Sequence, residues 1–305
     1  MFYYNDFTMS NFYYNFYKEV QLDKIRNVKI TRFNDYYIMI GSKVYREKNG
    51  KKKYLLYSYL TDDNFDIIEK SENILNFENI MVDYQDNIDI SCWIRDIYSK
   101  NDKYYLLVEF KKNNDEKYFT SEYYLLETTN FSKYEVTKKY DTCVSNIFLF
   151  KEYNENLFIS IIENTHHIWG KYLFEFIING NKVTPTFDKT VDYKKDYGHL
   201  LHHLSYDEIN NQYYVIFSIR HYSDSEKNNF YYKIYESYSN DLVNYYNTNE
   251  IIFKMNETIN SKWFCYPFKF VNENEEYIIC NQDDYGKYSK LILLKKVNKS
   301  MQQLE

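Results

Sequence analysis

Histidine is concentrated in one part of the sequence, where its imidazole groups could bind a ligand or transfer protons. All six histidines fall between residues 166 and 221, and they are His166, His167, His199, His202, His203 and His221. Two interpretations stay open: the histidines satisfy hydrogen bonds at strand ends, or some of them contact a substrate. A metal site needs three or four convergent ligands, which spacing alone does not establish, so we expect no metal and no cofactor.

An arginine and an aspartate are adjacent in the segment Trp93-Ile94-Arg95-Asp96-Ile97. A neighbouring cation favours the ionised carboxylate, so Asp96 is suited to accept hydrogen bonds and to stabilise positive charge. An ionised carboxylate is a poor general acid, and a proton donor would have to come from elsewhere. Asp196, Glu163 and a histidine are the candidates, and we count Asp96 and Asp196 as the candidate catalytic residues.

The segments that must position these residues are short and apolar, and the sequence predicts an all-β protein. Only six Gly and two Pro occur, so clusters of Asn, Asp and Lys must form the turns. One strand recurs five times after such a turn, beginning at Tyr36, Tyr104, Leu157, Tyr213 and Tyr277. Each copy is preceded by an apolar strand and followed by a third, and three of the third strands end in a similar polar turn.

Five such units predict a five-bladed β-propeller of four-stranded antiparallel blades. The last unit ends after its third strand, and residues 12–20 can supply the missing outer strand. We therefore expect residues 1–25 to close the ring and residues 26–305 to form one propeller domain. A large β-sandwich is the alternative fold.

This pattern of strands and turns resembles the five-bladed glycosidases of the arabinanase/xylosidase and invertase/levanase types, over residues 26–297. Two stretches carry the resemblance, residues 93–107 and the histidine-containing residues 198–221, which include Gly198-His199 and Arg220-His221. The resemblance implies an axial pocket for a carbohydrate ligand. It implies that Asp96 holds sugar hydroxyls and that the remaining substrate-binding residues are Arg95, Asn146, His199, His202, His203, His221, Trp93 and Tyr266.

The chain departs from that family where further carboxylates are expected. Glycoside hydrolysis requires at least two carboxyl groups in opposed roles. The first unit has Val28-Lys29-Ile30-Thr31 at the matching stretch, without an acid, and the third has the amide Asn146. Asp196 can substitute, although it lies in no recognisable motif.

Charge and composition limit the other classes of function. The net charge is −6, and lysine and arginine are scattered, whereas nucleic-acid binding needs a concentrated basic face. No apolar run approaches a membrane span and no leader is visible, so we expect no membrane association and a cytoplasmic location. The aromatic fraction of 21% reflects either codon composition or local surfaces for ring stacking.

Two functions remain. The first is a carbohydrate-active enzyme that cleaves or transfers a glycosyl unit. The second is an inactive propeller that binds a glycan or a protein. Two or three carboxylates near the axis would favour the enzyme, and one would favour the binding module. The sequence leaves the oligomeric state open.

Overall fold

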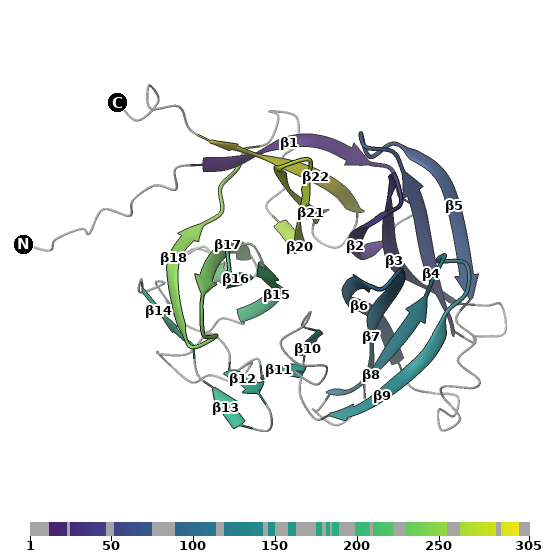
Figure 1. Cartoon of the computed structure of the whole chain (residues 1–305), viewed down its shortest axis with the longest axis horizontal. Coiled ribbons are helices and arrows are strands. Elements are labelled where there is room, and N and C mark those ends of the chain that lie inside the picture. Colours follow the sequence, from purple (N-terminus) through teal and green to yellow (C-terminus); the bar gives the residue numbers. More distant parts are fainter. Residues whose placement is uncertain are drawn as a thin grey trace, which may run out of the picture.

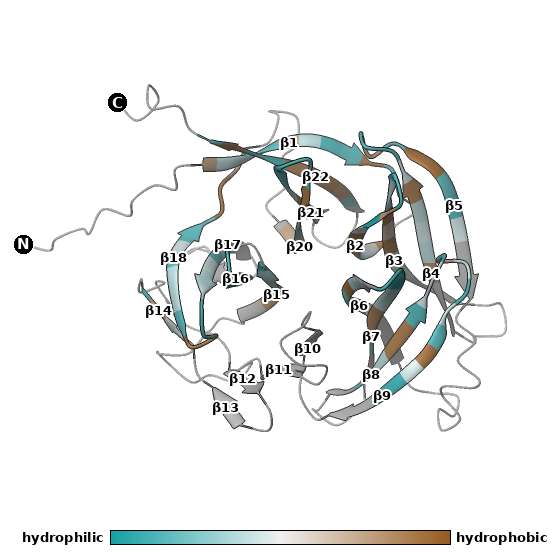
Figure 2. Ribbon diagram, viewed as in Figure 1, coloured by the Kyte–Doolittle hydropathy of each residue, from teal (hydrophilic) through white to brown (hydrophobic). Residues whose placement is uncertain are grey.

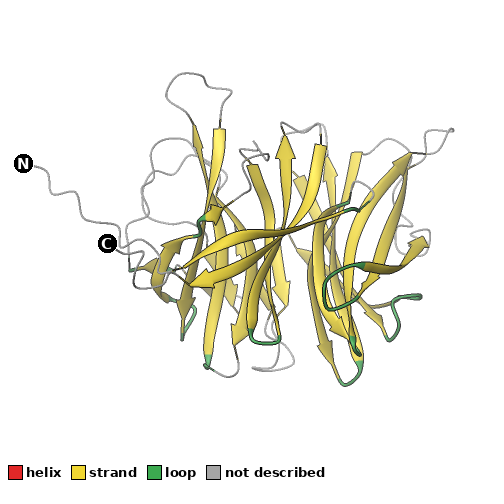
Figure 3. Cartoon of the chain, turned by 90° about the horizontal axis from the view of Figure 1, so that it is seen from above, coloured by secondary structure: helices red, strands yellow, loops and turns green. Residues whose placement is uncertain are grey.

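The structure is a computed structural model of the 305-residue chain. It describes residues 12–22, 25–46, 52–74, 89–113, 119–142, 146–149, 158–162, 175–178, 181–183, 185–188, 199–207, 210–222, 230–254, 263–284 and 288–298. All regular elements in these ranges are β-strands (Figure 3). No helix long and apolar enough to cross a membrane occurs in the ranges described.

The first two sheets are antiparallel meanders in which each strand pairs with its neighbours in sequence. The first sheet contains β2 (Arg26–Phe33), β3 (Tyr36–Arg46), β4 (Lys52–Thr61) and β5 (Ile67–Ile74). The second contains β6 (Asp89–Lys100), β7 (Lys103–Asn113), β8 (Phe119–Thr128) and β9 (Glu135–Thr142).

The third and fourth sheets repeat this order. The third contains β10 (Asn146–Leu149), β11 (Phe158–Ile162), β12 (Glu175–Ile178) and β13 (Asn181–Val183). The fourth contains β15 (His199–Asp207), β16 (Gln212–Tyr222), β17 (Phe230–Ser239) and β18 (Asn244–Glu250). The two-residue strand β14 (Thr186–Phe187) adds to the outer edge of the fourth sheet and pairs with β18 in parallel.

The last sheet combines the two ends of the described chain. Its strands β20 (Trp263–Asn272), β21 (Glu275–Asp284) and β22 (Tyr288–Asn298) form a meander. β1 (Phe12–Val20) then pairs antiparallel with β22, from Phe12 opposite Asn298 to Val20 opposite Leu291. β19 (Phe253–Lys254) pairs with β1 in parallel.

The sheets lie around a common centre, with β2, β6, β10, β15 and β20 innermost (Figure 1). The predicted all-β fold with four-stranded antiparallel blades in a propeller arrangement is thus confirmed, and the β-sandwich alternative is wrong. The recurring second strand is found at all five expected places, as β3, β7, β11, β16 and β21.

The core lies between neighbouring sheets and involves both faces of the middle strands. On β21, Tyr277 and Ile279 pack in a cluster with the first two sheets, whereas Ile278 and Cys280 pack in a cluster with the fourth sheet. Long apolar stretches therefore colour β22 brown, whereas the outer strand β18 is largely teal (Figure 2). Successive residues of β21 point to opposite faces of the sheet. Tyr277, Ile278, Ile279 and Cys280 are nevertheless all buried, because each face of the sheet packs against another sheet.

Three similar turns after the third strands insert an apolar side chain between sheets. Phe65, Phe131 and Leu242 have φ of 61°, 59° and 64° and are 1%, 1% and 3% exposed. The Phe65 ring lies 5.3 Å from Tyr277, and the Phe131 ring lies 5.3 Å from Phe33. These were the polar turns of the sequence repeat, and their apolar last residue packs against the preceding sheet.

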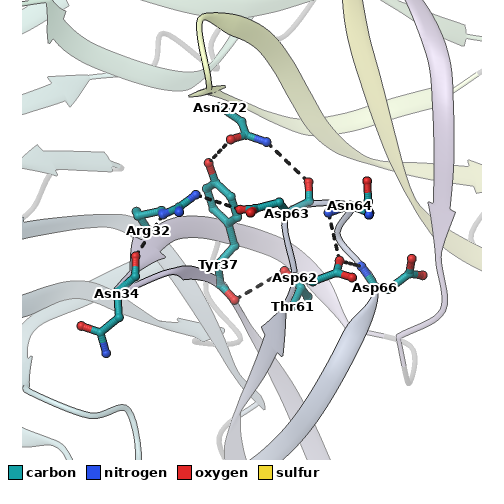
Figure 4. A network of polar contacts seen from close by, with 9 residues as sticks. All are labelled: Arg32, Asn34, Tyr37, Thr61, Asp62, Asp63, Asn64, Asp66 and Asn272. Carbon is teal, nitrogen blue, oxygen red and sulfur yellow. Dashed lines mark hydrogen bonds and ion pairs between the residues drawn. The ribbon is translucent and has the colours of Figure 1, made fainter.

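A polar network holds the first of these turns against the last sheet (Figure 4). Asp62 Oδ1 accepts hydrogen bonds from the backbone N–H groups of Asn64 and Asp66, at 2.9 and 2.8 Å. Tyr37 donates to Asn272 Oδ1 at 2.7 Å, and Asn272 Nδ2 donates to the Asp63 carbonyl at 3.5 Å. The turn that ends β4 is thereby linked to the end of β20.

The segment after β1 crosses close to the backbone of β3. A Cβ atom on Gly41 would lie 1.9 Å from Cγ2 of Ile25, a side chain that is 2% exposed. Only glycine leaves room for this approach. Gly41 therefore allows the chain to pass from the last sheet into the first.

We expect Tyr14→Ala to destabilise the protein by about 3–5 kcal/mol, because it truncates a fully buried aromatic side chain of β1. Tyr14→Phe should be close to neutral, since the Tyr14 hydroxyl is buried without a hydrogen-bond partner in the described part of the chain. Urea denaturation measures both changes. Tyr36→Ala, at a side chain that is 42% exposed, is the control and should cost under about 0.5 kcal/mol. Equal small effects at Tyr14 and Tyr36 would show that β1 does not contribute to the cooperative fold.

Candidate functional site

A β-bulge interrupts four of the inner strands, near the N-terminal end of β2, β15 and β20 and in the middle of β6. The pairing register shifts between Arg26 and Lys29 on β2 and between Ile94 and Asp96 on β6. It also shifts on β15 and β20, at residues 201–203 and 265–268. A bulge adds a residue to one strand and redirects its side chains, and bulges are frequent next to active sites. The polar and aromatic residues at these bulges are Asn27, Lys29, Arg95, Asp96, His202, His203 and Tyr266.

Lys29 lies where side chains from several sheets meet. It is 2% exposed, and its Nζ lies 4.8 Å from the centroid of the Phe268 ring of the last sheet. The charges of Asp96 and Arg95 in the second sheet act on Lys29, and the charge of Lys29 acts on His202 in the fourth. A side chain of the first sheet can have neighbours in three other sheets only at the centre of the ring. Lys29 therefore marks the axis.

Burial lowers the pKa of the Lys29 ammonium to about 7, because the charged form loses its hydration. The positive charge of Arg95 acts in the same direction, and the carboxylate of Asp96 opposes it. A large fraction of Lys29 is consequently a neutral amine near pH 7. Such an amine can accept a proton or act as a nucleophile.

Arg95 is bound by a carboxylate of the neighbouring strand. Its Nε donates to Glu109 Oε2 at 2.5 Å, and its Nη2 contacts the same oxygen. Glu109 is fully buried, and its other oxygen accepts a hydrogen bond from the Tyr123 hydroxyl at 3.1 Å. The side chain of Arg95 remains 17% exposed, so this pair fixes the guanidinium while leaving part of it accessible.

The carboxylate of Asp96, at the bulge of β6, acts electrostatically on Lys29. Asp96 is 7% exposed, and its Oδ1 accepts a hydrogen bond from the backbone N–H of Ile97 at 2.9 Å. The charges of Lys29 and Arg95 both act on His202. Convergence of Arg95, Asp96, Asn146 and one of His202 and His203 on a shared ligand site stays a prediction, because the Asn146 side chain lies outside the described ones.

The bulge of β15 brings two histidines to one face of the fourth sheet. His202 Nε2 and Ser218 Oγ are 2.7 Å apart, which fixes the imidazole on β16. The His203 ring packs edge-on against Phe268 at 4.5 Å. Burial lowers the pKa of His202 to about 3, and it lowers the pKa of His203 well below the usual range. The charge of Lys29 contributes to both shifts, so both imidazoles are neutral hydrogen-bonding groups near pH 7.

Two partly exposed aromatic rings lie beside these groups. Trp93 and Tyr266 have ring centroids 5.1 Å apart, although they belong to the second and the last sheet. The Tyr266 ring lies 6.3 Å from His202, and the Arg95 guanidinium lies 6.0 Å from the Trp93 ring. Tyr266 has a φ of 56°, an unusual conformation for a non-glycine residue that the bulge imposes. These rings give the site an apolar surface next to its charged groups.

A glutamine beside the site has unused hydrogen-bonding capacity. Gln282 on β21 lies opposite Phe264 of β20 and is 2% exposed. Neither its Nε2 nor its Oε1 has a hydrogen-bond partner within the described residues. A buried amide without partners is unusual, so Gln282 is a candidate for contact with a bound polar molecule.

Several sequence-based candidates are described only in part. The backbones of Asn146, His199 and His221 lie on β10, β15 and β16, paired with Ile161, Ile219 and Tyr231. Their side chains lie outside the described ones, and Asp196 lies outside the described residues altogether. Their roles stay predictions. Among the described residues, no three His, Cys, Asp or Glu side chains are grouped as metal ligands would be.

Sequence reasoning missed Lys29, Glu109 and Gln282. Lys29 was noted only as part of the stretch Val28-Lys29-Ile30-Thr31, in which an acid was absent. Glu109 and Gln282 lie just after the apolar segments that the sequence identified as second strands, which end at Val108 and Cys280. The available signal was a polar residue close to such an apolar segment.

Comparisons with known proteins identify the fold. No family model matches the chain, and no curated protein matches it by sequence. Among solved structures it is similar to an exo-1,5-α-L-arabinanase from a bovine ruminal metagenomic library, with a TM-score of 0.55 and 12% identity over 90% of this chain and 95% of the other. A glycosyl hydrolase from Bacteroides ovatus gives a TM-score of 0.58 with 9% identity, covering 94% of this chain and 88% of its own.

A third similar structure is a mannose phosphorylase from Leishmania mexicana in complex with a phosphate ion. Its TM-score is 0.56 at 8% identity, over 92% of this chain and 87% of the other. At these identities the likeness concerns the fold. It places the chain among propeller structures of the kind that glycoside hydrolases and a sugar phosphorylase use.

We expect Lys29→Met to leave the protein as stable as wild type or more stable at pH 7, since it replaces a buried amine by an apolar side chain of similar length. The folded pKa of Lys29 is below the ordinary value of 10.5, so the unfolded chain binds the additional proton between about pH 7 and pH 10.5. Wild-type stability should therefore rise with pH in this window relative to Lys29→Met, by up to about 1.4 kcal/mol per pH unit.

Urea denaturation at pH 7, 8 and 9 measures this difference. Lys290→Met is the matched control, because the side chain of Lys290 is 51% exposed. If the difference in unfolding free energy between wild type and Lys29→Met does not change with pH, the lowered pKa of Lys29 is contradicted.

Proposed function

We propose that this chain binds a carbohydrate at the axis, on the surface formed by the bulges of the inner strands. The observation that carries the proposal is the contact of Trp93 with Tyr266 beside the polar groups of Arg95, Asp96 and His202. Sugars present both apolar C–H faces and hydroxyl groups, so they are recognised by aromatic rings next to fixed donors and acceptors. The fold of the similar glycosyl hydrolases supports the same class of ligand.

The proposed architecture treats the five sheets as the blades of one ring. β1 completes the last blade, which joins the N-terminal part of the chain to its C-terminal strands. A closed ring keeps the inner strands at fixed separations, because no sheet has a neighbour on one side only. The site depends on this rigidity, since its residues come from three sheets: the second, the fourth and the last.

Each polar group has a separate task in this proposal. Asp96 accepts hydrogen bonds from sugar hydroxyls, and the accessible part of the Arg95 guanidinium donates to sugar oxygens. His202 is held by Ser218 and remains neutral, so it can donate or accept without carrying a charge into the site. The pairing of Arg95 with Glu109 limits how far the guanidinium can move, which favours one orientation of the ligand.

Cleavage or transfer of a glycosyl unit is the second candidate function. Hydrolysis by two carboxyl groups needs a partner for Asp96. Within the described residues, Glu109 on β7 is a candidate for this second carboxyl group. Both of its oxygens already accept hydrogen bonds, one from Arg95 and the other from Tyr123. The described geometry therefore favours binding, and turnover would need an acid such as Asp196.

We expect Trp93→Ala and Tyr266→Ala each to weaken oligosaccharide binding roughly tenfold, which corresponds to about 1.4 kcal/mol for the loss of one stacking surface. Isothermal titration calorimetry with arabino-, xylo- and manno-oligosaccharides measures the effect. Tyr36→Ala, on an exposed ring that pairs with Phe33 at the opposite end of β2 from its bulge, should bind like wild type. Unchanged binding in both site variants would overturn the proposed site.

Asp96→Asn separates the two candidate functions. If the protein is an enzyme, a screen of nitrophenyl glycosides should find wild-type turnover that this variant loses, with a nearly unchanged melting temperature. If it is a binding module, no wild-type turnover exists and the variant should bind the oligosaccharide more weakly. A variant that binds and reacts like wild type would remove Asp96 from the site.

A further inference from the structure

The amine of Lys29 is the buried group that the proposed binding function does not use. It is 2% exposed, and its Nζ lies over the face of the Phe268 ring, 4.8 Å from the ring centroid. Within the described part of the chain it makes no hydrogen bond and no ion pair. A buried ammonium without hydrogen bonds costs several kcal/mol, so a neutral amine is favoured here.

The charged groups that act on Lys29 are Asp96 and Arg95 of β6, and the charge of Lys29 in turn acts on His202 and His203 of β15. Lys269 of β20 also acts on His203. Arg95 and Lys269 are both held by carboxylates, Glu109 and Glu276, and both histidines are neutral. Asp96 is therefore the carboxylate that acts directly on the Lys29 amine.

This arrangement is the one that makes a lysine nucleophilic. Lysines that form imines with carbonyl substrates are desolvated in apolar surroundings or lie near another cationic group. Lys29 has both features, since Phe268 covers one side and Arg95 lies nearby. Asp96 can accept and return the protons that move during the addition of an amine to a carbonyl group.

We propose that Lys29 is a nucleophile that forms a reversible imine with the aldehyde of a reducing sugar in its open-chain form. The Nζ lone pair attacks the carbonyl carbon, a C–N bond forms, and the C=O π electrons pass to the oxygen. A proton moves from nitrogen to that oxygen and gives a carbinolamine. Loss of water then leaves a C=N bond, so that amine and aldehyde yield one imine and one water.

This assignment rests on the proposed function of the axial site and names the part of the ligand that reaches Lys29. Trp93 and Tyr266 would hold the sugar chain, and its reducing end would lie toward the buried amine. The reaction needs no oxidant, metal or cofactor, because imine formation is a condensation. It differs from glycoside hydrolysis, in which no amine of the protein bonds to the sugar.

The test traps the imine in the wild-type protein. Glycolaldehyde and cyanoborohydride are added at pH 7, hydride from cyanoborohydride reduces the imine to a secondary amine, and peptide mass spectrometry compares the lysines. We expect Lys29 to be modified at least about tenfold faster than the half-exposed Lys290, because far more of it is unprotonated. The difference should disappear in urea, where the fold no longer lowers the proton affinity of Lys29.

Two sugars distinguish a sugar ligand from any small aldehyde. Arabinose should give a pentosyl adduct on Lys29, and arabinitol, which has no carbonyl group, should give none. Lys29→Arg should lose the adduct while Lys290 reacts as before. If that variant does not fold, the site-resolved comparison within the wild-type protein decides the question.

Modification of Lys29 no faster than that of Lys290 would overturn the proposal, and a glycolaldehyde adduct without an arabinose adduct would overturn its assignment to a sugar. These outcomes can be told apart from a failure of the proposed glycan-binding function. Glycan binding that depends on Trp93 can exist without an imine, and an imine at Lys29 can form when oligosaccharides do not bind.

Discussion

The middle strands β3, β7, β16 and β21 are buried on both faces, and this constraint determines how the sheets are arranged. On β21, side chains of odd number meet the first sheet and those of even number meet the fourth. A sheet that is apolar on both faces cannot remain at an open end, because one face would meet water. Sheets of this kind must each have two neighbours. Twisted sheets packed face to face around a centre satisfy that requirement, and the N-terminal strand pairs with the C-terminal one at the outer edge.

Such packing also determines where polar chemistry can occur. Between the sheets, some buried polar groups are paired, as when Tyr214 donates to Oε2 of the fully buried Glu236 at 2.8 Å. Others, such as Glu236 Oε1 and the Tyr14 hydroxyl, have no hydrogen-bond partner within the described residues. Burial raises the pKa of Glu236, and the charge of Lys269 opposes that shift. At the axis, the innermost strands converge from several sheets and the bulges replace regular pairing. Charged, amide and aromatic side chains therefore lie at the bulges of the inner strands.

The electrostatics of the axial site follow from this geometry. Lys29, Arg95 and Lys269 are three cations in a small region, and two of them are neutralised by Glu109 and Glu276. The third faces Asp96, two neutral histidines and the Phe268 ring, and its pKa falls. The same burial keeps His202 and His203 neutral. The site near pH 7 thus offers neutral donors and acceptors beside one carboxylate, which suits an uncharged polyhydroxy ligand better than a strongly ionic one.

The sequence by itself determined the strands and their order. Alternation of apolar runs with Asn- and Asp-rich turns is a local property, so the second strand of every unit was located within one or two residues. It also indicated Arg95, Asp96, Trp93 and Tyr266 as candidate site residues, together with Asn146, Asp196 and four histidines, and the roles of all of them stay predictions. Tertiary structure alone decided that Arg95 is bound to Glu109 and that Lys29 points to the axis. The register shifts on β2 and β6 redirect these side chains, and a one-residue shift in a strand reverses which face a residue occupies. Bulges and the contacts between distant sheets leave no local pattern, because they arise only when strands far apart in sequence come together.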